Sequence, residues 1–192
     1  MGDYFQAIVD LDATQGEAAG LAGAVLAWLV AEGIVRAERS DCVLGGSGHA
    51  PGPRFGTTVA EQGPGVPDLW ADGMGVIVRR TVFYPGQDDG GLQCPHCGRL
   101  EQRDGSYTGP VPSQWRRFHS AAKGWMDGGP AEATCAYCGL PVALNEWQWE
   151  SEPWAVGALG FTFWNCPPLL PAFVAEVGGR LGHPVRLVSG KF

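Results

Sequence analysis

Four of the six cysteines stand in two matching C-x-x-C pairs, each followed by a glycine. The pairs are Cys94 with Cys97 and Cys135 with Cys138. Zinc takes four soft ligands in a tetrahedron, with each sulfur about 2.3 Å from the metal. Two intervening residues allow one tight turn to direct both sulfurs at one ion, and the glycine permits the unusual backbone of that turn. The spacing therefore predicts one zinc ion held by these four cysteines.

Other chemistries explain the paired cysteines less well. Disulfides are rare in a reducing cytosol, and a redox motif accounts for one pair without its twin. A catalytic zinc keeps one position open for water, whereas four thiolates close the tetrahedron. We therefore predict a structural zinc. His96, inside the first pair, is able to replace a cysteine, but we expect it on the exposed part of the turn.

The two remaining cysteines, Cys42 and Cys166, have no C-x-x-C partner. A lone cysteine is most often a small buried apolar residue. A nucleophilic cysteine needs a neighbouring base, and nothing in the sequence links either one to His49 or His183. No catalytic residue is predicted.

Residues 45–73 hold eight glycines and four prolines and are expected to form a long loop. The start of this segment, GGSGHAPGP, lacks a required residue of the nucleophile-elbow, dinucleotide-loop and phosphate-loop motifs. An ordinary surface loop is the simplest interpretation. Because long ordered loops often carry function, His49, Asp68, Trp70 and Asp72 are candidates for a ligand site or a partner surface.

Residues 4–33 predict a strand followed by a helix. Apolar and polar residues alternate through YFQAIVDLDA, which is typical of a strand with one buried face. Thr14 and Glu17 form a capping-box pattern at a helix start. Apolar residues then recur at helical spacing from Leu21, and Gly33 is the expected stop.

The C-terminal part repeats this order, with a strand in AVGALGFTFWN, a helix in LLPAFVAEVGGRLG and a last strand in PVRLVSG. GVIVRRTVFY, residues 75–84, predicts one strand between the two halves. The resulting order predicts an α+β fold, the ferredoxin-like split βαβ sandwich, with two helices on one four-stranded sheet. The connection over 34–74 is longer than this fold needs. Its start, IVRAERSDCVL, is a candidate for an additional strand.

The cysteine-bearing segment, residues 91–141, is predicted to be a zinc-ribbon-like insert in the hairpin between the middle strands. Residues 1–90 and 142–192 then form the sandwich, because the adjacent strand ends of a hairpin tolerate an insertion. PSQWRRFHSAAKGWMDG predicts a short helix within the insert. We interpret the insert as poor in large apolar residues, and we therefore expect it to be folded only when the metal is bound.

Eight tryptophans are many for 192 residues. Trp147, Trp149, Trp154 and Trp164 lie close to the predicted strand in AVGALGFTFWN. Large aromatic side chains dominate core packing, so most are expected in the core. Several exposed together would mark a partner surface.

The formal charge is −7, from 13 Lys and Arg against 20 Asp and Glu. Four thiolates and one Zn²⁺ subtract four and add two, which gives −9. An acidic body repels phosphate backbones, so we expect no general nucleic-acid binding and favour a basic protein partner. No apolar stretch reaches the ~18 residues that cross a bilayer, and the N-terminus lacks the basic region of a secretory signal. A cytoplasmic location without a membrane partner is the expectation.

Five sequence stretches together resemble an uncharacterised family of bacterial hypothetical proteins. They are LAWLVAEGIV, APGP, the paired CxxCG turns, FTFWNCPPL and LGHPVRLVSGKF. Some members of that family carry a transporter-ATPase label, but this chain has no Walker A motif. The resemblance spans nearly the whole chain and implies no activity. Cys166 stands where Trp would be expected after FWN.

An acidic body, a closed metal site and the lack of a catalytic motif favour a non-enzymatic protein-binding module. An inhibitor or an immunity-type partner of a basic protein fits this description. The alternative is a small-molecule enzyme with its site in the 45–73 loop, built from His49, Asp68 and Asp72. A transcription- or nucleic-acid-associated zinc ribbon comes third. Residues 94–138 hold five basic and four acidic side chains, and the zinc centre with four thiolates adds −2, so their net charge is −1.

Overall fold

The computed structural model describes residues 2–61, 70–86, 89–104, 110–151 and 153–191. These residues form three α-helices and thirteen strands, and the pairings between the named strands are antiparallel. The predicted mixed α+β class is therefore confirmed. Among the described helices, none is both long and apolar enough to cross a membrane.

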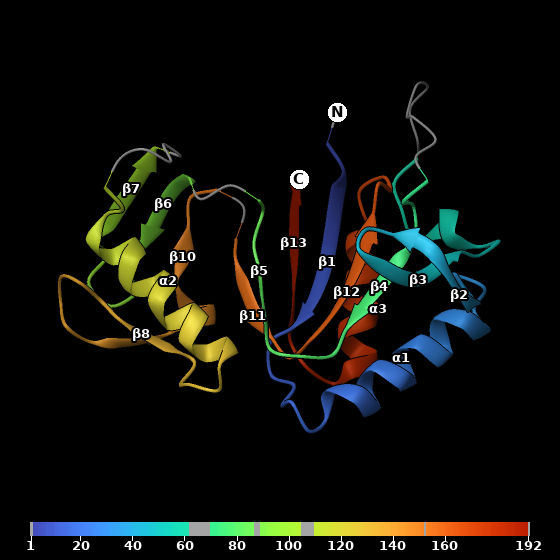
Figure 1. Cartoon of the computed structure of the whole chain (residues 1–192), viewed down its shortest axis with the longest axis horizontal. Helices are drawn as coiled ribbons and strands as arrows, with labels where there is room; N and C mark the ends of the chain where they lie inside the picture. The colour runs from blue at the N-terminus through green and yellow to red at the C-terminus, as the bar shows by residue number, and fades with distance from the viewer. Residues whose placement is uncertain (1, 62–69, 87–88, 105–109, 152, 192) are drawn as a thin grey trace.

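The larger lobe is built on a six-stranded sheet, on the right of Figure 1. Its spatial order is β13-β1-β12-β4-β3-β2. The strands are β1 (Tyr4–Asp10), β2 (Val35–Val43), β3 (Gly46–Pro51), β4 (Met74–Ile77), β12 (Leu159–Trp164) and β13 (Val185–Lys191). Tyr4 of β1 lies opposite Lys191 of β13, so the two ends of the described chain meet at the edge of this lobe.

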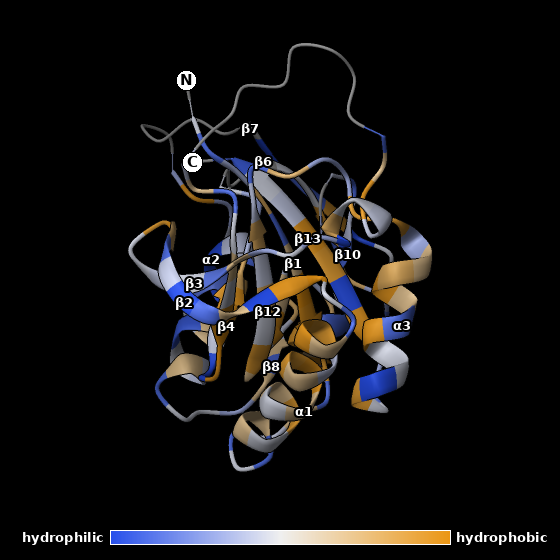
Figure 2. Ribbon diagram, turned by 90° about the vertical axis from the view of Figure 1, so that its right-hand side faces the viewer, coloured by the Kyte–Doolittle hydropathy of each residue, from blue (hydrophilic) through white to orange (hydrophobic). Residues whose placement is uncertain are grey.

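Two helices cover one face of the six-stranded sheet (Figure 2). They are α1 (Ala18–Ala31), which follows β1, and α3 (Pro171–Leu181), which follows β12. The predicted stop of the first helix is confirmed: Gly33 follows α1 with a left-handed φ of 67°. Gly182 follows α3 in the same way, with a φ of 73°. Glycine adopts this backbone without a Cβ penalty, which is why it ends so many helices.

The sheet is packed on both faces at β1. On the helix side, Ile8 joins Val25, Phe161 and Phe173 in the main core. Phe5, Ala7 and Val9 point to the opposite face and pack with other buried side chains, including Phe83, Ala155 and Val188. The expectation of one buried face is therefore wrong for β1. Ile8, which breaks the alternation, is the residue that fills the helix-side core.

A hairpin of β2 and β3 extends the sheet beyond the four strands that we expected. The hairpin lies within the long connection predicted over 34–74, and IVRAERSDCVL does form a strand. Most of β2 is exposed because it lies at the edge of the sheet. Its charged side chains therefore stay in water, and it lacks the alternation that marks a half-buried strand. Gly45, with φ 71°, occupies the turn to β3.

The predicted single strand over 75–84 is two strands in different sheets. β4 belongs to the six-stranded sheet, whereas β5 (Thr81–Phe83) pairs with β11 (Ala155–Gly157). The predicted strand in AVGALGFTFWN is divided in the same way, into β11 and β12. Residues 78–80 separate β4 from β5, and the Gln15 side chain holds them by bonding Val78 O and Arg80 N.

The second lobe, here called the cysteine lobe, comprises the described residues between 84 and 154, on the left of Figure 1. It connects to the sheet through the β5–β11 pair. It contains β6 (Asp89–Gln93), β7 (Leu100–Asp104), α2 (Ser113–Met126), β8 (Glu132–Thr134), β9 (Pro141–Ala143) and β10 (Gln148–Trp149). Two short 3₁₀ helices, Phe55–Thr57 and Leu144–Glu146, complete the described elements.

The cysteine lobe has a large aromatic core of its own. Trp115 and Phe118 are fully buried, and Trp147 and Trp154 are nearly so. The rings of Trp149 and Trp154 stack with their centroids 5.4 Å apart. The expectation that residues 91–141 are poor in large apolar residues is wrong for α2, which buries Trp115, Phe118 and Trp125. Residues 142–154, outside the predicted insert, add further tryptophans to the same cluster.

Two arginines tie the lobes together by donating to main-chain carbonyls. Arg186 of β13 reaches Trp154 O and Asn145 O, both at 2.7 Å. Arg80 donates to Trp125 O at 2.9 Å and lies over the Trp125 ring. Charged donors make the stronger class of hydrogen bond, so these contacts fix how the cysteine lobe sits on the sheet.

Candidate metal centre

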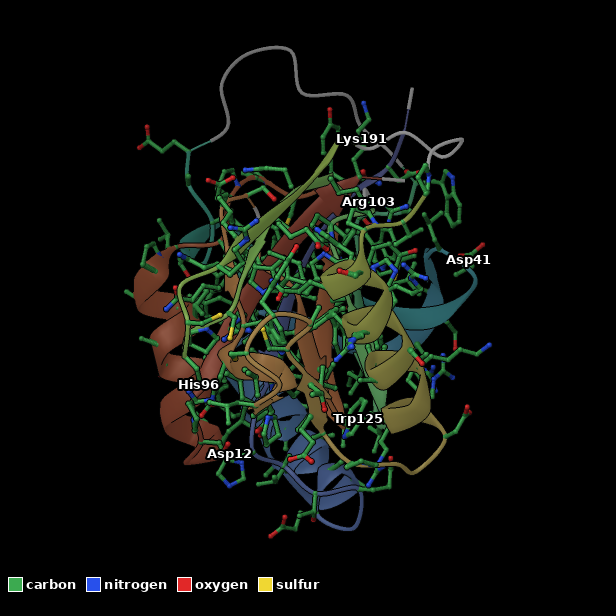
Figure 3. The ribbon with its side chains drawn as sticks, turned by 90° about the vertical axis from the view of Figure 1, so that its left-hand side faces the viewer. Asp12, Asp41, His96, Arg103, Trp125 and Lys191 are labelled. Atoms are coloured by element: carbon green, nitrogen blue, oxygen red, sulfur yellow. The ribbon has the colours of Figure 1, made fainter. Side chains whose placement is uncertain are left out.

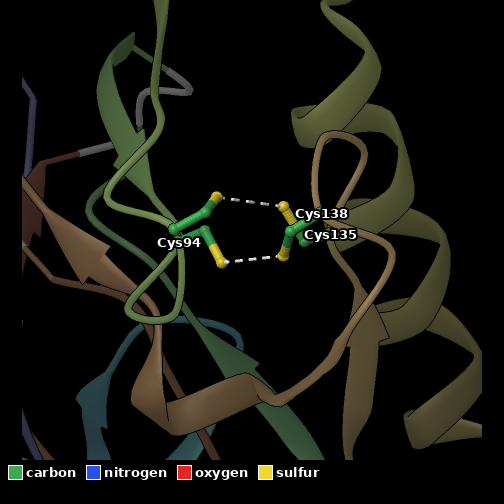
Figure 4. A group of neighbouring side chains, drawn as sticks. Cys94, Cys135 and Cys138 are labelled. Atoms are coloured by element: carbon green, nitrogen blue, oxygen red, sulfur yellow. Dashed lines mark hydrogen bonds between the residues drawn. The ribbon is translucent and has the colours of Figure 1, made fainter.

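The four predicted cysteines come together at one point of the cysteine lobe (Figure 4). All four sulfur atoms lie within 4.8 Å of one another. Cys94 Sγ and Cys138 Sγ are 3.9 Å apart, as are Cys97 Sγ and Cys135 Sγ. A tetrahedron with bonds of about 2.3 Å has sulfurs about 3.8 Å apart, whereas a disulfide needs about 2.05 Å. The spacing suits a shared metal ion and not two disulfides.

The two cysteine turns have the same backbone geometry. Gly98 N donates to Cys94 O at 2.9 Å, and Gly139 N donates to Cys135 O at 3.2 Å. Both glycines are left-handed, with φ of 67° and 73°. The N–H of the first cysteine in each turn donates to the carbonyl five residues on, that of Arg99 or Leu140. Each C-x-x-C-G stretch thus closes the same loop, and the two loops face each other.

The inner and outer cysteines differ in exposure. Cys94 and Cys135 are fully buried against the aromatic core, while Cys97 is exposed. Water therefore reaches the centre from one side only. A metal at this point would join the two turns to the core of the lobe.

Burial is the largest influence on both inner thiols. It raises the pKa of Cys94 to about 11. At Cys135 burial also raises the pKa, but the N–H groups of Cys138 and Tyr137 and hydrogen bonds with other thiols outweigh it, and the pKa is about 7. Because a bound divalent ion deprotonates its thiol ligands outright, these directions describe the metal-free form.

Gln114 connects α2 to both turns from a fully buried position. Its amide Nε2 donates to Leu92 O of β6 at 2.8 Å and to Arg99 O, just before β7, at 3.3 Å, on either side of the first turn. Its Oε1 lies 3.2 Å from Cys135 Sγ. The thiol donates that hydrogen bond, which is therefore possible only while Cys135 keeps its proton. The two carbonyl contacts do not depend on the metal.

His96 lies on the exposed part of the first turn, as expected (Figure 3). Its Nε2 is 3.2 Å from Pro141 O, so the ring bridges the first turn to the strand after the second. Tyr137 and Leu140 are also exposed at the turn tips, by 46% and 50%. We call His96, Tyr137 and Leu140 the turn-tip surface.

The lone cysteines are packed elsewhere in the fold. Cys42 is buried against Gly73, where a Cβ would lie 2.2 Å from its sulfur. Cys166 is partly buried, and burial raises its pKa to about 11. A thiol with so high a pKa is a poor nucleophile at neutral pH.

The candidate residues of the 45–73 segment occupy different environments. His49 is a buried residue of β3 whose Nδ1 lies 2.9 Å from Arg36 O. Trp70 is 65% exposed. Asp72 lines a shallow hollow in which His49 takes no part. Asp68 lies outside the described residues. Much of the first part of the segment is strand and 3₁₀ helix, because 46–51 pairs with β2.

A buried acid–histidine pair was not predicted from the sequence. Asp10, 1% exposed, accepts the main-chain N–H of Asp12 and Ala13 and lies 3.0 Å from His183 Nδ1. The hydrogen bond to Asp10 raises the pKa of His183 above its ordinary value. The pair connects the end of β1 to the loop before β13, and its members are too far apart in sequence for a spacing argument.

Comparisons with known proteins add no assignment: no family model, curated protein or solved structure matches the chain. The resemblance to an uncharacterised bacterial family stays a prediction.

Proposed function

We propose that Cys94, Cys97, Cys135 and Cys138 bind one zinc ion with a structural role. The sulfur spacing supports a tetrahedral ion. All-thiolate sites select soft or borderline metals such as zinc over magnesium or calcium. Free thiols in such a site suit a reducing compartment, so a cytoplasmic location belongs to the same proposal.

We also propose that the larger lobe is an extended ferredoxin-like sandwich. The order β13-β1-β12-β4, with α1 and α3 on one face, supports this interpretation. In a split βαβ fold the first strand lies between the last and the third, and the second is at the edge. The β2–β3 hairpin would then be an addition to the edge beside β4.

The function we propose is a zinc-containing protein-binding module with a basic partner, such as an inhibitor or an immunity-type protein. The observation that carries it is the turn-tip surface, where Tyr137 and Leu140 are exposed beside the four thiolates. Exposed aromatic and aliphatic side chains are typical anchors in interface centres. Zinc with four thiolates has a formal charge of −2, which would attract a cationic partner to this edge of the lobe.

A capture experiment with a matched control tests this function. The immobilised protein should retain a basic protein from its native host, and moderate salt should weaken the capture. Leu140→Glu should reduce retention at least about tenfold, because a charge at an interface centre is costly. Leu170→Glu is the control, since Leu170 is 36% exposed in the other lobe.

Equal retention by Leu140→Glu and Leu170→Glu would contradict the proposed surface. Retention of nucleic acid in place of a basic protein would favour the zinc-ribbon alternative.

A further inference from the structure

The six-stranded sheet carries an open cleft on the face that α1 and α3 leave uncovered. Its volume is about 500 Å³, within the range of pockets for small molecules. The floor and walls include Phe5, Val43, Ile77, Phe83, Thr162 and Trp164. No cysteine of the metal centre lines it, so this cleft is independent of the function proposed above.

Two features of the strands open this space. β3 pairs with β4 through His49 and Met74, and the turn at Gly45–Ser47 lies beyond that pair. On the other side, residues 78–80 carry the chain out of the six-stranded sheet into β5. The cleft therefore lies between the β2–β3 turn and β5, over β4 and β12.

The charge at the cleft is opposite to that of the protein. Arg39 and Arg79 line it, and its lining residues include no Asp or Glu, although the chain as a whole carries −7. Arg39 is held near the opening because its Nη2 donates to Ser47 O at 2.5 Å. Guanidinium groups bind carboxylates well because their donors form a planar fork.

A buried hydroxyl of the floor has no partner. Thr162 is 6% exposed, and its Oγ1 makes no hydrogen bond. A buried polar atom without a partner is destabilising, so native proteins contain few of them. Gly75 is paired with Thr162 across the two strands, and a Cβ on Gly75 would meet only Thr162 O, at 3.9 Å. The floor of the cleft is therefore open above Gly75, whereas the Thr162 Oγ1 atom itself is covered.

We propose that this cleft binds a small amphipathic carboxylate. The apolar body lies on Phe5, Ile77 and Trp164, and the carboxylate meets Arg39 or Arg79 at the opening. The far end of the ligand occupies the open space above Gly75.

Two rigid probes test the charge requirement of this proposal. They are 2-naphthoate and neutral 2-naphthol, each titrated into the whole protein by calorimetry. We expect one 2-naphthoate per chain, with 2-naphthol at least about tenfold weaker, as expected for the loss of a charged hydrogen bond. Amide shifts in NMR spectra should cluster at Gly45–Ser47, Gly75 and Thr162.

Variants test the named residues. Gly75→Val should fill the cleft and abolish binding, since its Cβ meets no close atom. Arg39→Gln and Arg79→Gln should each weaken carboxylate binding up to about tenfold. Arg116→Gln, an exposed position on α2, should not. Thr162→Val should keep carboxylate binding and raise the Tm, because it removes an unpartnered hydroxyl that the ligand does not reach.

Several outcomes would overturn the proposal. They are equal binding of 2-naphthol and 2-naphthoate, unchanged binding to folded Gly75→Val, or no binding at millimolar probe, which would leave the cleft a water-filled hollow. An acidic peptide that binds where 2-naphthoate does not would make it a protein-docking site. If Gly75→Val does not fold, the NMR map of the unmodified protein decides alone, and shifts outside the cleft contradict the proposal.

Discussion

At the scale of single residues, the metal centre is the most locally encoded part of the molecule. Each turn needs two cysteines, two intervening residues and a glycine in left-handed backbone, and all five are consecutive. Residues so close in sequence have few alternative arrangements, so their spacing alone identified all four members of the cluster. The cysteine spacing restricts the metal to ions that prefer thiolate ligands, but it does not select one of these ions.

Removing one outer ligand should release the metal without disturbing the aromatic core. We expect about one zinc per chain in the unmodified protein and less than about half of that in Cys138→Ser, because a hydroxyl replaces a thiolate ligand. Elemental analysis of protein purified without added metal measures this. Cys166→Ser, distant from the turns, should keep its zinc. Full zinc in Cys138→Ser would mean that Cys138 is not a ligand.

The candidates predicted in the 45–73 loop show that the environment of a side chain cannot be inferred from its sequence neighbours alone. His49 looks like a loop residue beside glycines and prolines, yet β3 buries it and Arg36 O satisfies its ring nitrogen. The unpartnered hydroxyl of Thr162 lies in a sequence that reads as an ordinary strand. Only the arrangement of neighbouring strands shows that the His49 ring has a hydrogen-bond partner and that the Thr162 hydroxyl has none.

At the scale of elements, the spacing of apolar residues located the strands and helices that contribute buried side chains to the core of the larger lobe. β1, α1, β12, α3 and β13 all fall where apolar spacing placed them. The edge strand β2 was predicted only as a candidate, because its largely polar residues do not alternate. The break between β4 and β5 was missed, because it depends on Gln15, a residue more than sixty positions away, holding residues 78–80.

The contact between α2 and the cysteine turns should depend on Gln114. Gln114→Met keeps the volume but leaves Leu92 O and Arg99 O without this donor. We expect a loss of about 1–3 kcal/mol in the free energy of unfolding, the range for a buried polar group that loses its partner. Urea denaturation measures it. Gln102→Met, at an exposed position on β7 whose side chain donates to the exposed Glu150 carboxylate, should cost less than about 1 kcal/mol.

A cost for Gln114→Met as small as that for Gln102→Met would show that water satisfies the two carbonyls, and that α2 is held by aromatic packing alone. The proton on Cys135 adds a second expectation. Since metal binding removes the donor of the Cys135–Gln114 hydrogen bond, Gln114→Met loses that bond only in the metal-free protein, and the cost should be smaller when zinc is present.

At the scale of the whole molecule, two cores meet at the β5–β11 pair. Val82 and Val156 of this pair pack with the cysteine lobe, whereas Phe83 and Ala155 pack with the open face of the sheet. The pair therefore belongs to both lobes. Together with Arg80 and Arg186 it couples them, although each lobe has its own apolar cluster.

Metal removal should loosen the cysteine lobe and leave the sheet folded. With a zinc chelator, calorimetry should show two transitions, because only one lobe loses its crosslink. Five of the eight tryptophans belong to the cysteine lobe, so their fluorescence should follow the first transition. The aromatic core should nevertheless keep the lobe compact at room temperature, and the amides of the cysteine turns should exchange first.

A single transition after chelation would mean that the coupling through β5 and β11 is strong enough to make the two lobes one cooperative unit. A lobe that unfolds completely at room temperature would mean that its aromatic core cannot hold without metal. Hydrogen exchange in β1 and β12 is the internal control, since these strands should remain protected throughout.

The position of the cysteine lobe also bears on how the gene could evolve. The lobe enters and leaves the sheet through two strands that already lie side by side, with Phe83 opposite Ala155. A gene could gain or lose such a lobe at this hairpin by one insertion or deletion, without changing the order of any other strand. Proteins that descend from one ancestral sheet could therefore carry different inserted segments at this hairpin.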